Sequence, residues 1–195
     1  MDSTDATRAK AAIRAAALAR RDALPPGVRA QYGKEILRQI LALQEFTAAR
    51  TVFAYYGFGS EIDTTPLLQA VLEDNKKLLL PRVNRKAGVL DLYEVRSLQT
   101  DLRAGVWGIP EPNPEVCPPG LAADIDLVIA PGAAFDRKGG RIGYGKGYYD
   151  KLLANRHPLI VAGAFNVQLV DAVPLEPHDV LVDLLITETG QPRRK

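Results

Sequence analysis

The sequence has little cysteine, little net charge and no long apolar segment. Cys117 is the only cysteine among 195 residues, which excludes an internal disulfide and suits a reducing cytoplasm. No run approaches the roughly 18 to 20 apolar residues of a membrane-spanning helix. The net charge of +2 provides no general basic field for nucleic acid. We therefore expect one cytoplasmic domain over residues 1–195, a monomer that binds small molecules and neither nucleic acid nor membrane.

The segment from Gly139 to Asp150 is the most informative part of the chain. It holds five glycines, two cations, three tyrosines and a carboxylate. Glycines at alternate positions from 143 to 147 permit positive φ and leave no side chains in the way, so successive N–H groups can point at one anion. A helical pattern resumes at Tyr148, and a helix N-terminus favours negative charge. The segment predicts a phosphate-binding loop to which Arg141 and Lys146 add positive charge.

Two common nucleotide motifs do not fit this loop. The spacing from Gly140 to Lys146 matches the first part of a Walker A motif, but Gly147 stands where Ser or Thr should bind magnesium. The glycine spacing also differs from the dinucleotide fingerprint. A glycine-rich surface turn with incidental charges remains the alternative.

Hydrophobic periodicity predicts alternating helices and strands, which is typical of an α/β sandwich of three layers around a mainly parallel sheet. The expected helices cover residues from about 5 to 24, from 65 to 74 and from 148 to 156, and a second helix after the first includes the apolar repeat from 32 to 43. The expected strands cover residues 51–56, 77–80, 89–95, 126–130, 158–165 and 180–186. Prolines and glycines between residues 105 and 119 predict no regular structure.

Several charged residues outside the loop are candidates for the same site. Lys10 and Arg14 are four residues apart on the first helix, so they share one face and could meet phosphates; solvated surface charges are the alternative. Nucleotide phosphates call for a divalent ion, and magnesium prefers carboxylates and water. Asp150 and Asp179 are the candidate ligands, although each alone is more often a helix cap or a surface residue. His178 lacks metal-ligand spacing, so we expect it to be structural.

The stretch from Arg141 to Asp150 resembles the signature of the 5-formyltetrahydrofolate cyclo-ligase family nearly throughout. The resemblance extends to Lys10 and Arg14, the loop from residue 55 to 64, the segment from 107 to 112, and His178 with Asp179. It implies a fold like that of NagB, ribose-phosphate isomerase and CoA transferases. It also implies ATP-dependent cyclisation of 5-formyltetrahydrofolate to 5,10-methenyltetrahydrofolate, with release of ADP and phosphate.

The resemblance implies a role for each part of the site. Arg141 and Lys146 are the expected catalytic residues, and Mg²⁺ is expected at Asp150 and Asp179. The residues expected to bind the folate are Tyr56, Glu61, Trp107 and Tyr148. The residues expected to bind ATP are Lys10, Arg14, Arg141, Ile142, Gly143, Tyr144, Gly145, Lys146, Gly147, Tyr148 and Tyr149.

The implied mechanism solves a leaving-group problem. Direct attack of N10 on the N5-formyl carbon would have to expel oxide or hydroxide. In the family mechanism the formyl oxygen attacks the γ-phosphate, N10 then closes the ring, and phosphate departs. Two alternatives stay open: a sugar-phosphate isomerase or CoA transferase on the same architecture, and a non-catalytic nucleotide- or RNA-binding module.

Overall fold

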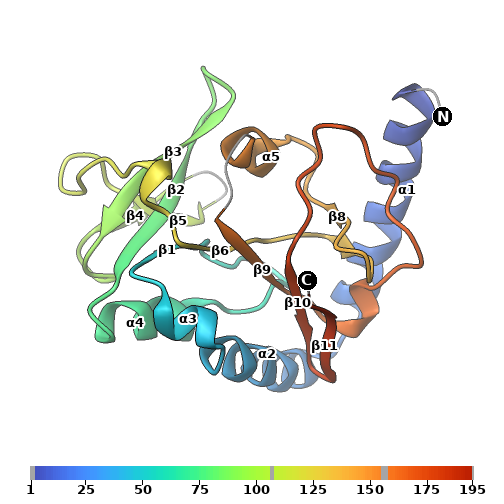
Figure 1. Cartoon of the computed structure of the whole chain (residues 1–195), viewed down its shortest axis with the longest axis horizontal. Helices are drawn as coiled ribbons and strands as arrows, with labels where there is room; N and C mark the ends of the chain where they lie inside the picture. Colours follow the sequence, from blue (N-terminus) through green and yellow to red (C-terminus); the bar gives the residue numbers. More distant parts are fainter. Residues whose placement is uncertain (1–2, 106–107, 155–157, 195) are drawn as a thin grey trace.

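The computed structural model describes residues 3–105, 108–154 and 158–194. A seven-stranded sheet runs through the centre of the molecule (Figure 1). Its strands, in spatial order, are β11 (Gly190–Arg194), β10 (Leu184–Thr187), β9 (Leu159–Gly163), β6 (Leu127–Ile129), β1 (Thr51–Phe53), β2 (Lys77–Asn84) and β3 (Val89–Val95). The five inner strands pair in parallel, and the two edge strands pair antiparallel with their neighbours. The predicted mainly parallel sheet is confirmed.

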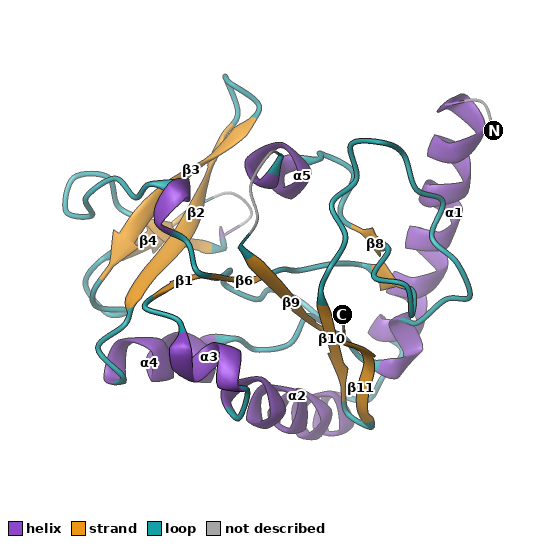
Figure 2. Ribbon diagram, viewed as in Figure 1, coloured by secondary structure: helices purple, strands orange, loops and turns teal. Residues whose placement is uncertain are grey.

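Helices and two small hairpins surround this sheet (Figure 2). The α-helices are α1 (Ser3–Asp22), α2 (Pro26–Leu41), α3 (Gln44–Ala48), α4 (Thr65–Glu73) and α5 (Tyr148–Leu153). The described residues also form short 3-10 helices at η2 (Ala122–Asp124) and η3 (Asn166–Gln168). The hairpins pair β4 (Leu102–Ala104) with β5 (Pro110–Pro112), and β7 (Ala134–Phe135) with β8 (Arg141–Ile142).

Alternation along the inner strands divides the core between the two faces of the sheet. In β1, Val52 belongs to the apolar cluster under α2 and α4, whereas Phe53 belongs to the cluster under α5. Successive side chains of a strand point to opposite faces, so both faces must be covered. Phe53 stacks on Tyr149 of α5 with ring centroids 5.5 Å apart. The result is the predicted three-layer arrangement.

The face covered by α2 is packed at close range. Pro26 occupies the first turn of α2, where its missing N–H leaves no hydrogen bond unmade. Ile36 and Ile40 are buried, and a β-carbon at Gly163 of β9 would lie 2.8 Å from Ile36 Cγ2. This contact requires a glycine in the strand.

The helix α1 packs beside the sheet, next to the β7–β8 hairpin. Ala17 is fully buried and forms a small apolar cluster with Ala134, Ile142 and Val173. Ile142 of that cluster belongs to the glycine-rich segment. Packing of α1 therefore positions the start of the predicted phosphate loop.

Some elements differ from the sequence-based expectation. The last predicted strand, 180–186, begins only at Leu184: Asp183 N–H already donates to Ile160 O of β9, but Val182 N–H donates to Gly139 O, outside the sheet. The polar edge strand β11, the short helix α3 and the β4–β5 hairpin were not predicted. β5 consists of Pro110, Glu111 and Pro112, and prolines concealed this strand from pattern reasoning.

Candidate functional site

The glycine-rich loop connects β8 to α5. Gly145 has φ +91° and Gly147 has φ +62°, and both values favour glycine. Gly143 is absent from the positive-φ residues, so two of the three alternate glycines use the backbone freedom that the sequence permits. Tyr144, Gly145 and Lys146, which lie between Gly143 and Gly147, are exposed.

Two cavities flank the loop and meet at Arg141 and Asp150. The first has a volume of about 220 Å³ and is lined mostly by aromatic and aliphatic side chains. The second has a volume of about 250 Å³ and is lined mostly by charged and glycine residues. We call them the aromatic cavity and the charged cavity. Gly143 and Gly147 also line both, so the loop separates the two spaces.

In the charged cavity, Lys10 is held by two carboxylates. Its ammonium lies 2.8 Å from Glu176 Oε2 and 2.6 Å from Asp179 Oδ2. Burial lowers the pKa of Lys10, but the hydrogen bonds from the ammonium to Asp179 and Glu176 outweigh it, and the net shift is upward. Lys10 therefore neutralises the acidic residues that a divalent ion would use.

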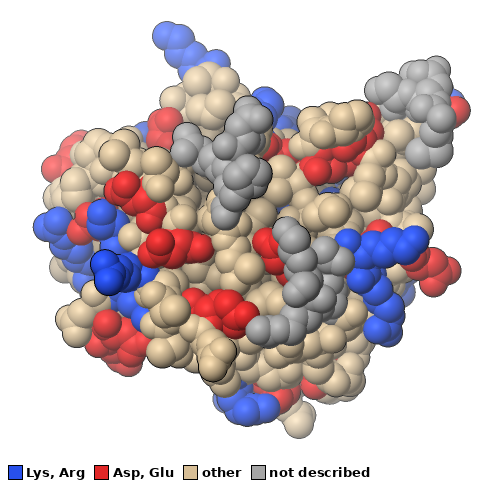
Figure 3. Space-filling model, in the orientation of Figure 1, with Lys and Arg blue, Asp and Glu red and all other residues tan. Residues whose placement is uncertain are grey.

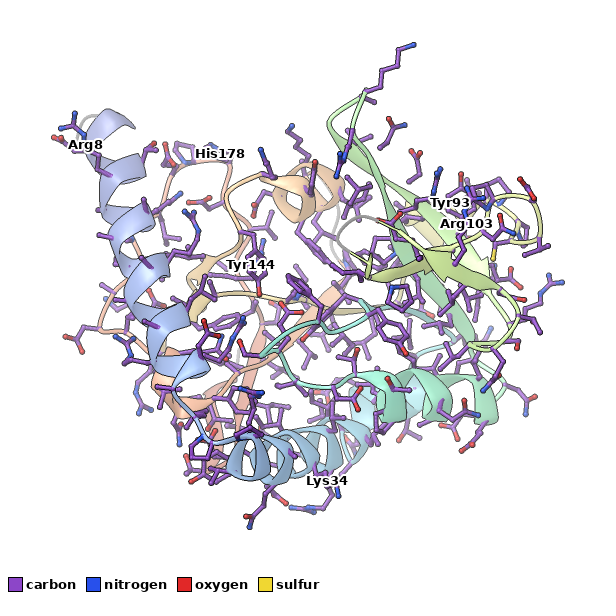
Figure 4. The ribbon with its side chains drawn as sticks, turned by 180° about the vertical axis from the view of Figure 1, so that it is seen from behind. Arg8, Lys34, Tyr93, Arg103, Tyr144 and His178 are labelled. Carbon is purple, nitrogen blue, oxygen red and sulfur yellow. The ribbon has the colours of Figure 1, made fainter. Side chains whose placement is uncertain are left out.

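The same acidic group has the donor set of a possible metal site. Donor atoms of Glu176, His178 and Asp179 lie within 4.8 Å of one another. His178 is exposed and comes within 3.9 Å of Asp179. Figure 4 shows His178 on the loop beside the N-terminal half of α1. Glu176 was not among the predicted ligands.

Arg14 contacts the glycine loop itself. Its Nε donates to the carbonyl oxygen of Gly143 over 2.7 Å. A β-carbon at Gly145 would lie 3.4 Å from Arg14 Nη2. The guanidinium thus lies against the loop backbone and lines the charged cavity, as the shared helix face of Lys10 and Arg14 suggested.

Arg141 lies buried at the junction of the two cavities. Its Nη2 donates to Asp150 Oδ1 over 2.9 Å, and its Nη1 donates to the carbonyl oxygen of Pro131 over 3.3 Å. The guanidinium also lies 5.6 Å from the centre of the Tyr149 ring. Asp150 accepts a further bond from Val180 N–H over 3.2 Å. Both residues are therefore fixed by several contacts.

The aromatic cavity contains Tyr56, Glu61 and Tyr148 of the predicted folate site. Tyr56 accepts a hydrogen bond from Thr65 over 3.3 Å. The buried hydroxyl of Tyr149 has no hydrogen-bond partner within the described residues. Trp107, the remaining predicted folate residue, lies outside the described residues.

Glu61 connects the two loops that border the aromatic cavity. Its Oε2 accepts the Phe58 N–H over 3.1 Å, and its Oε1 accepts a short hydrogen bond from the Tyr144 hydroxyl. Burial raises the pKa of Glu61, and these hydrogen bonds only partly offset the shift. The rings of Phe58 and Tyr144 are 5.7 Å apart.

The structure brings most of the predicted residues to one place, apart from Trp107. Lys10, Arg14, Ile142, Gly145, Asp150 and Asp179 line the charged cavity, and the other predicted residues within the described chain line the aromatic cavity or the wall that the two cavities share. Sequence reasoning overlooked Arg21, which hydrogen-bonds Tyr144. The spacing of positions 10, 14, 17 and 21 could have revealed it, since these share one helix face.

Charged side chains of both signs are mixed on one face of the molecule. On the face seen in Figure 3, groups of Lys and Arg are separated by acidic and other residues. Among the described helices, none is both long and apolar enough to cross a membrane.

Comparison with known proteins identifies similar chains. The sequence model of the 5-formyltetrahydrofolate cyclo-ligase family matches residues 6–188. The Mycolicibacterium smegmatis 5-formyltetrahydrofolate cyclo-ligase is 33% identical, over 92% of this chain and 94% of its own length. The mitochondrial 5-formyltetrahydrofolate cyclo-ligase of Arabidopsis thaliana is 34% identical, over 86% of this chain and 70% of its own.

Comparison with solved structures gives the same result. The 5,10-methenyltetrahydrofolate synthetase of Aquifex aeolicus superposes with a TM-score of 0.83 at 34% identity, covering 95% of this chain and 92% of its own. A synthetase from Mycoplasma pneumoniae, 21% identical, superposes with a TM-score of 0.73 over 92% of this chain and 98% of its own, which supports the fold. The isomerase, CoA-transferase and RNA-binding alternatives receive no such support.

Proposed function

The chain belongs to the 5-formyltetrahydrofolate cyclo-ligase family, and we propose that its two cavities bind the two substrates of that reaction. The protein is a cyclo-ligase that converts 5-formyltetrahydrofolate to 5,10-methenyltetrahydrofolate. ATP is the co-substrate in this proposal, with its phosphates in the charged cavity and the pterin in the aromatic cavity.

One observation carries this assignment: the two cavities meet at Arg141. A γ-phosphate held on the loop would lie beside the space that accepts the folate. Phosphoryl transfer requires mainly alignment and charge neutralisation, because the protein does little covalent chemistry. A shared wall made of a glycine loop and a guanidinium meets both requirements.

The predicted binding residues fit these roles by their chemistry. Lys10 and Arg14 bring positive charge to the phosphates from α1, while Lys146 and Arg141 bring it from the loop side. The Glu61 carboxylate can accept pterin N–H groups, and the rings of Tyr56 and Tyr148 provide apolar surface. Lys146 makes no hydrogen bond or ion pair to the described chain, so its ammonium is available to an anion.

The order of steps follows from the leaving group. The formyl oxygen attacks the γ-phosphorus, the bond to the bridging oxygen of ADP breaks, and the formyl carbon becomes an activated iminium phosphate. N10 attacks that carbon and loses its proton, and the carbon–oxygen bond breaks to release phosphate. Arg141 and Lys146 stabilise the charge of the transferring phosphoryl group.

Magnesium is part of the proposal because of the donor chemistry. The carboxylates of Asp150 and Asp179 line the same cavity and are the ligand type that a hard divalent ion prefers. Such an ion would offset the charge of the phosphates when bound. Their present partners, Arg141 and Lys10, are cations, so the site already accommodates positive charge at these oxygens.

The direct test is an assay of the product. Purified protein, ATP, Mg²⁺ and 5-formyltetrahydrofolate should give the near-ultraviolet absorbance of the methenyl product and one ADP for each molecule formed. Omission of ATP or of the folate provides the controls. Release of ADP without the absorbance, or no reaction at all, would contradict the proposal.

A further inference from the structure

Arg21 lies between the two loops that border the substrate cavities. It projects from the last turn of α1, and only 5% of its surface is exposed. Its Nε donates to Ser60 Oγ over 2.8 Å, and its Nη1 donates to the Tyr144 hydroxyl over 3.1 Å. Ser60 belongs to the loop that carries Glu61, and Tyr144 belongs to the glycine loop. One buried guanidinium therefore contacts both loops.

Arg21 is itself held by the chain around it. Ser60, which accepts from Arg21, donates a short hydrogen bond to Asp22, the next residue on α1. Planar guanidinium groups present several donors in a fixed geometry. A lysine at this position has no such fork and could not reproduce both contacts in the same orientation. The arrangement fixes the direction from which Arg21 reaches Tyr144.

The hydroxyl of Tyr144 links Arg21 to Glu61. It accepts a hydrogen bond from Arg21 and donates one to the Glu61 carboxylate. Burial and the adjacent Glu61 carboxylate raise the pKa of Tyr144, so the hydroxyl keeps the proton that it donates. The two hydrogen bonds therefore run in one direction, from the guanidinium through the phenol to the carboxylate. It ends on the group that is proposed to bind the pterin.

Tyr144 is also part of the loop that is proposed to hold the phosphates. It lies between Gly143, whose carbonyl oxygen accepts from Arg14, and Gly145, which has positive φ. Figure 4 shows Tyr144 on the inner side of α1. Any ligand that fixes the backbone of residues 143–147 also fixes where the Tyr144 hydroxyl stands relative to Glu61.

We propose that Arg21 is a positioning residue that holds Tyr144 against Glu61, so that nucleotide on the glycine loop strengthens folate binding. The inference rests on the proposed function and extends it to communication between the two substrates. A contact shared by both sites couples their affinities, and the coupling must be equal in both directions. Occupancy of the loop orders Tyr144, which orders the carboxylate for the pterin.

The coupling can be measured directly by titration calorimetry. Binding of 5-formyltetrahydrofolate is measured with and without saturating β,γ-imido-ATP and Mg²⁺, which cannot transfer the phosphoryl group. We expect the nucleotide to tighten folate binding by about tenfold in the wild-type protein, within the usual range of coupling free energies. The reciprocal titration should give the same factor.

The variants test which residues carry the coupling. Arg21→Met keeps the length of the side chain and removes its donors, and Tyr144→Phe removes only the hydroxyl. Both should bring the coupling factor to about one. Arg20→Met is the matched control, since Arg20 adjoins Arg21 on α1, is exposed and donates to the Val167 carbonyl oxygen, away from both cavities. It should retain the wild-type factor.

The outcomes separate this inference from the proposed function. Wild-type protein that binds both ligands without coupling would overturn the inference alone, as would undiminished coupling in the Tyr144→Phe protein. Arg21→Met that lowers the melting temperature and keeps the coupling would show a purely structural role and also overturn it. If Arg21→Met does not fold, Tyr144→Phe and Ser60→Ala decide the question. Failure of the wild-type protein to bind the folate would contradict the proposed function itself.

Discussion

The two cavities beside Arg141 differ in how their polar groups are satisfied. In the charged cavity, Lys10 is bonded to Glu176 and Asp179, and Arg14 to the Gly143 carbonyl. In the aromatic cavity, the Tyr149 hydroxyl is buried without a partner in the described chain. The charged groups of the charged cavity already have partners within the chain, so a ligand must displace one of these partners in order to bind. The aromatic cavity leaves a donor unused, so a ligand can add a hydrogen bond.

The difference has energetic consequences for binding. A phosphate that takes Lys10 from its carboxylates gains one ion pair and exposes two like charges, unless another cation replaces the ammonium. This favours simultaneous binding of nucleotide and divalent ion. A pterin that enters the aromatic cavity meets mostly aromatic and aliphatic side chains, so burial of its ring contributes directly to affinity. The variants below test these two types of site.

The largest effect should come from Lys146→Ala, which removes an ammonium without a partner in the described chain. We expect kcat/KM to fall about a hundredfold or more, the scale of losing one group that stabilises transition-state charge. The free energy of unfolding should change by less than about 0.5 kcal/mol, since the side chain is exposed. ADP release and urea denaturation measure the two quantities. Lys138→Ala, exposed and outside both cavities, is the control; equal losses in both proteins would contradict a role for Lys146.

The next largest effect should come from Asp136→Asn, which replaces a buried carboxylate that is already satisfied by the chain itself. Asp136 is 2% exposed, and it accepts N–H groups of Lys138, Gly140 and Val173 over 2.8 to 2.9 Å. An amide at this position would set N–H against N–H, and loss of such charge-assisted bonds costs about 2 kcal/mol. Urea denaturation should show this loss. Asp171→Asn, an exposed change, should be neutral, and a stable Asp136→Asn protein would contradict the structural role.

The sequence predicted the elements whose cause is local. The apolar periodicity of α2 and the glycine-rich run each act through neighbouring residues, so α2, the loop and its link to α5 could be inferred. The family resemblance then supplied roles for the residues of the loop. The edge strand β11 was missed because its residues, Gly190–Arg194, are polar and include a proline.

Contacts between distant segments could not be predicted. Lys10 and Glu176 are 166 positions apart, and the packing of α1 beside the loop between η3 and β10 brings them together. Arg141 was expected to face the phosphates, but sequence alone could not show that it is buried and bonded to Asp150. Side-chain partners depend on the whole packed structure, whereas the glycine loop depends on backbone freedom in a few residues.

An intermediate effect should come from Lys10→Met, which leaves the acidic pair without its cation. The free energy of unfolding should fall by about 1 to 2 kcal/mol, since the three side chains are only 11 to 20% exposed. Added Mg²⁺ should raise the melting temperature of this variant more than that of the wild-type protein, because the ion replaces the ammonium. Lys34→Met, on the outer side of α2 (Figure 4), is the control. A Lys10→Met protein whose melting temperature does not respond to Mg²⁺ would contradict the metal proposal at Asp179.

The smallest effect on stability should come from Tyr149→Phe, which removes the unused donor of the aromatic cavity. Because the hydroxyl lacks a partner, its loss should change the free energy of unfolding of the ligand-free protein by less than about 0.5 kcal/mol, or stabilise it slightly. Burial raises the pKa of Tyr149, so the hydroxyl remains a donor across the neutral range.

Binding should respond differently from stability. A folate carbonyl oxygen that reaches this donor would lose one hydrogen bond in Tyr149→Phe, and affinity for 5-formyltetrahydrofolate should fall about three- to tenfold. Titration with 5-methyltetrahydrofolate then locates the acceptor: an equal loss indicates the pterin carbonyl, and a loss confined to the formyl compound indicates the formyl oxygen. Unchanged affinity for both would show that the hydroxyl stays unused, and the two cavities would then differ in charge alone.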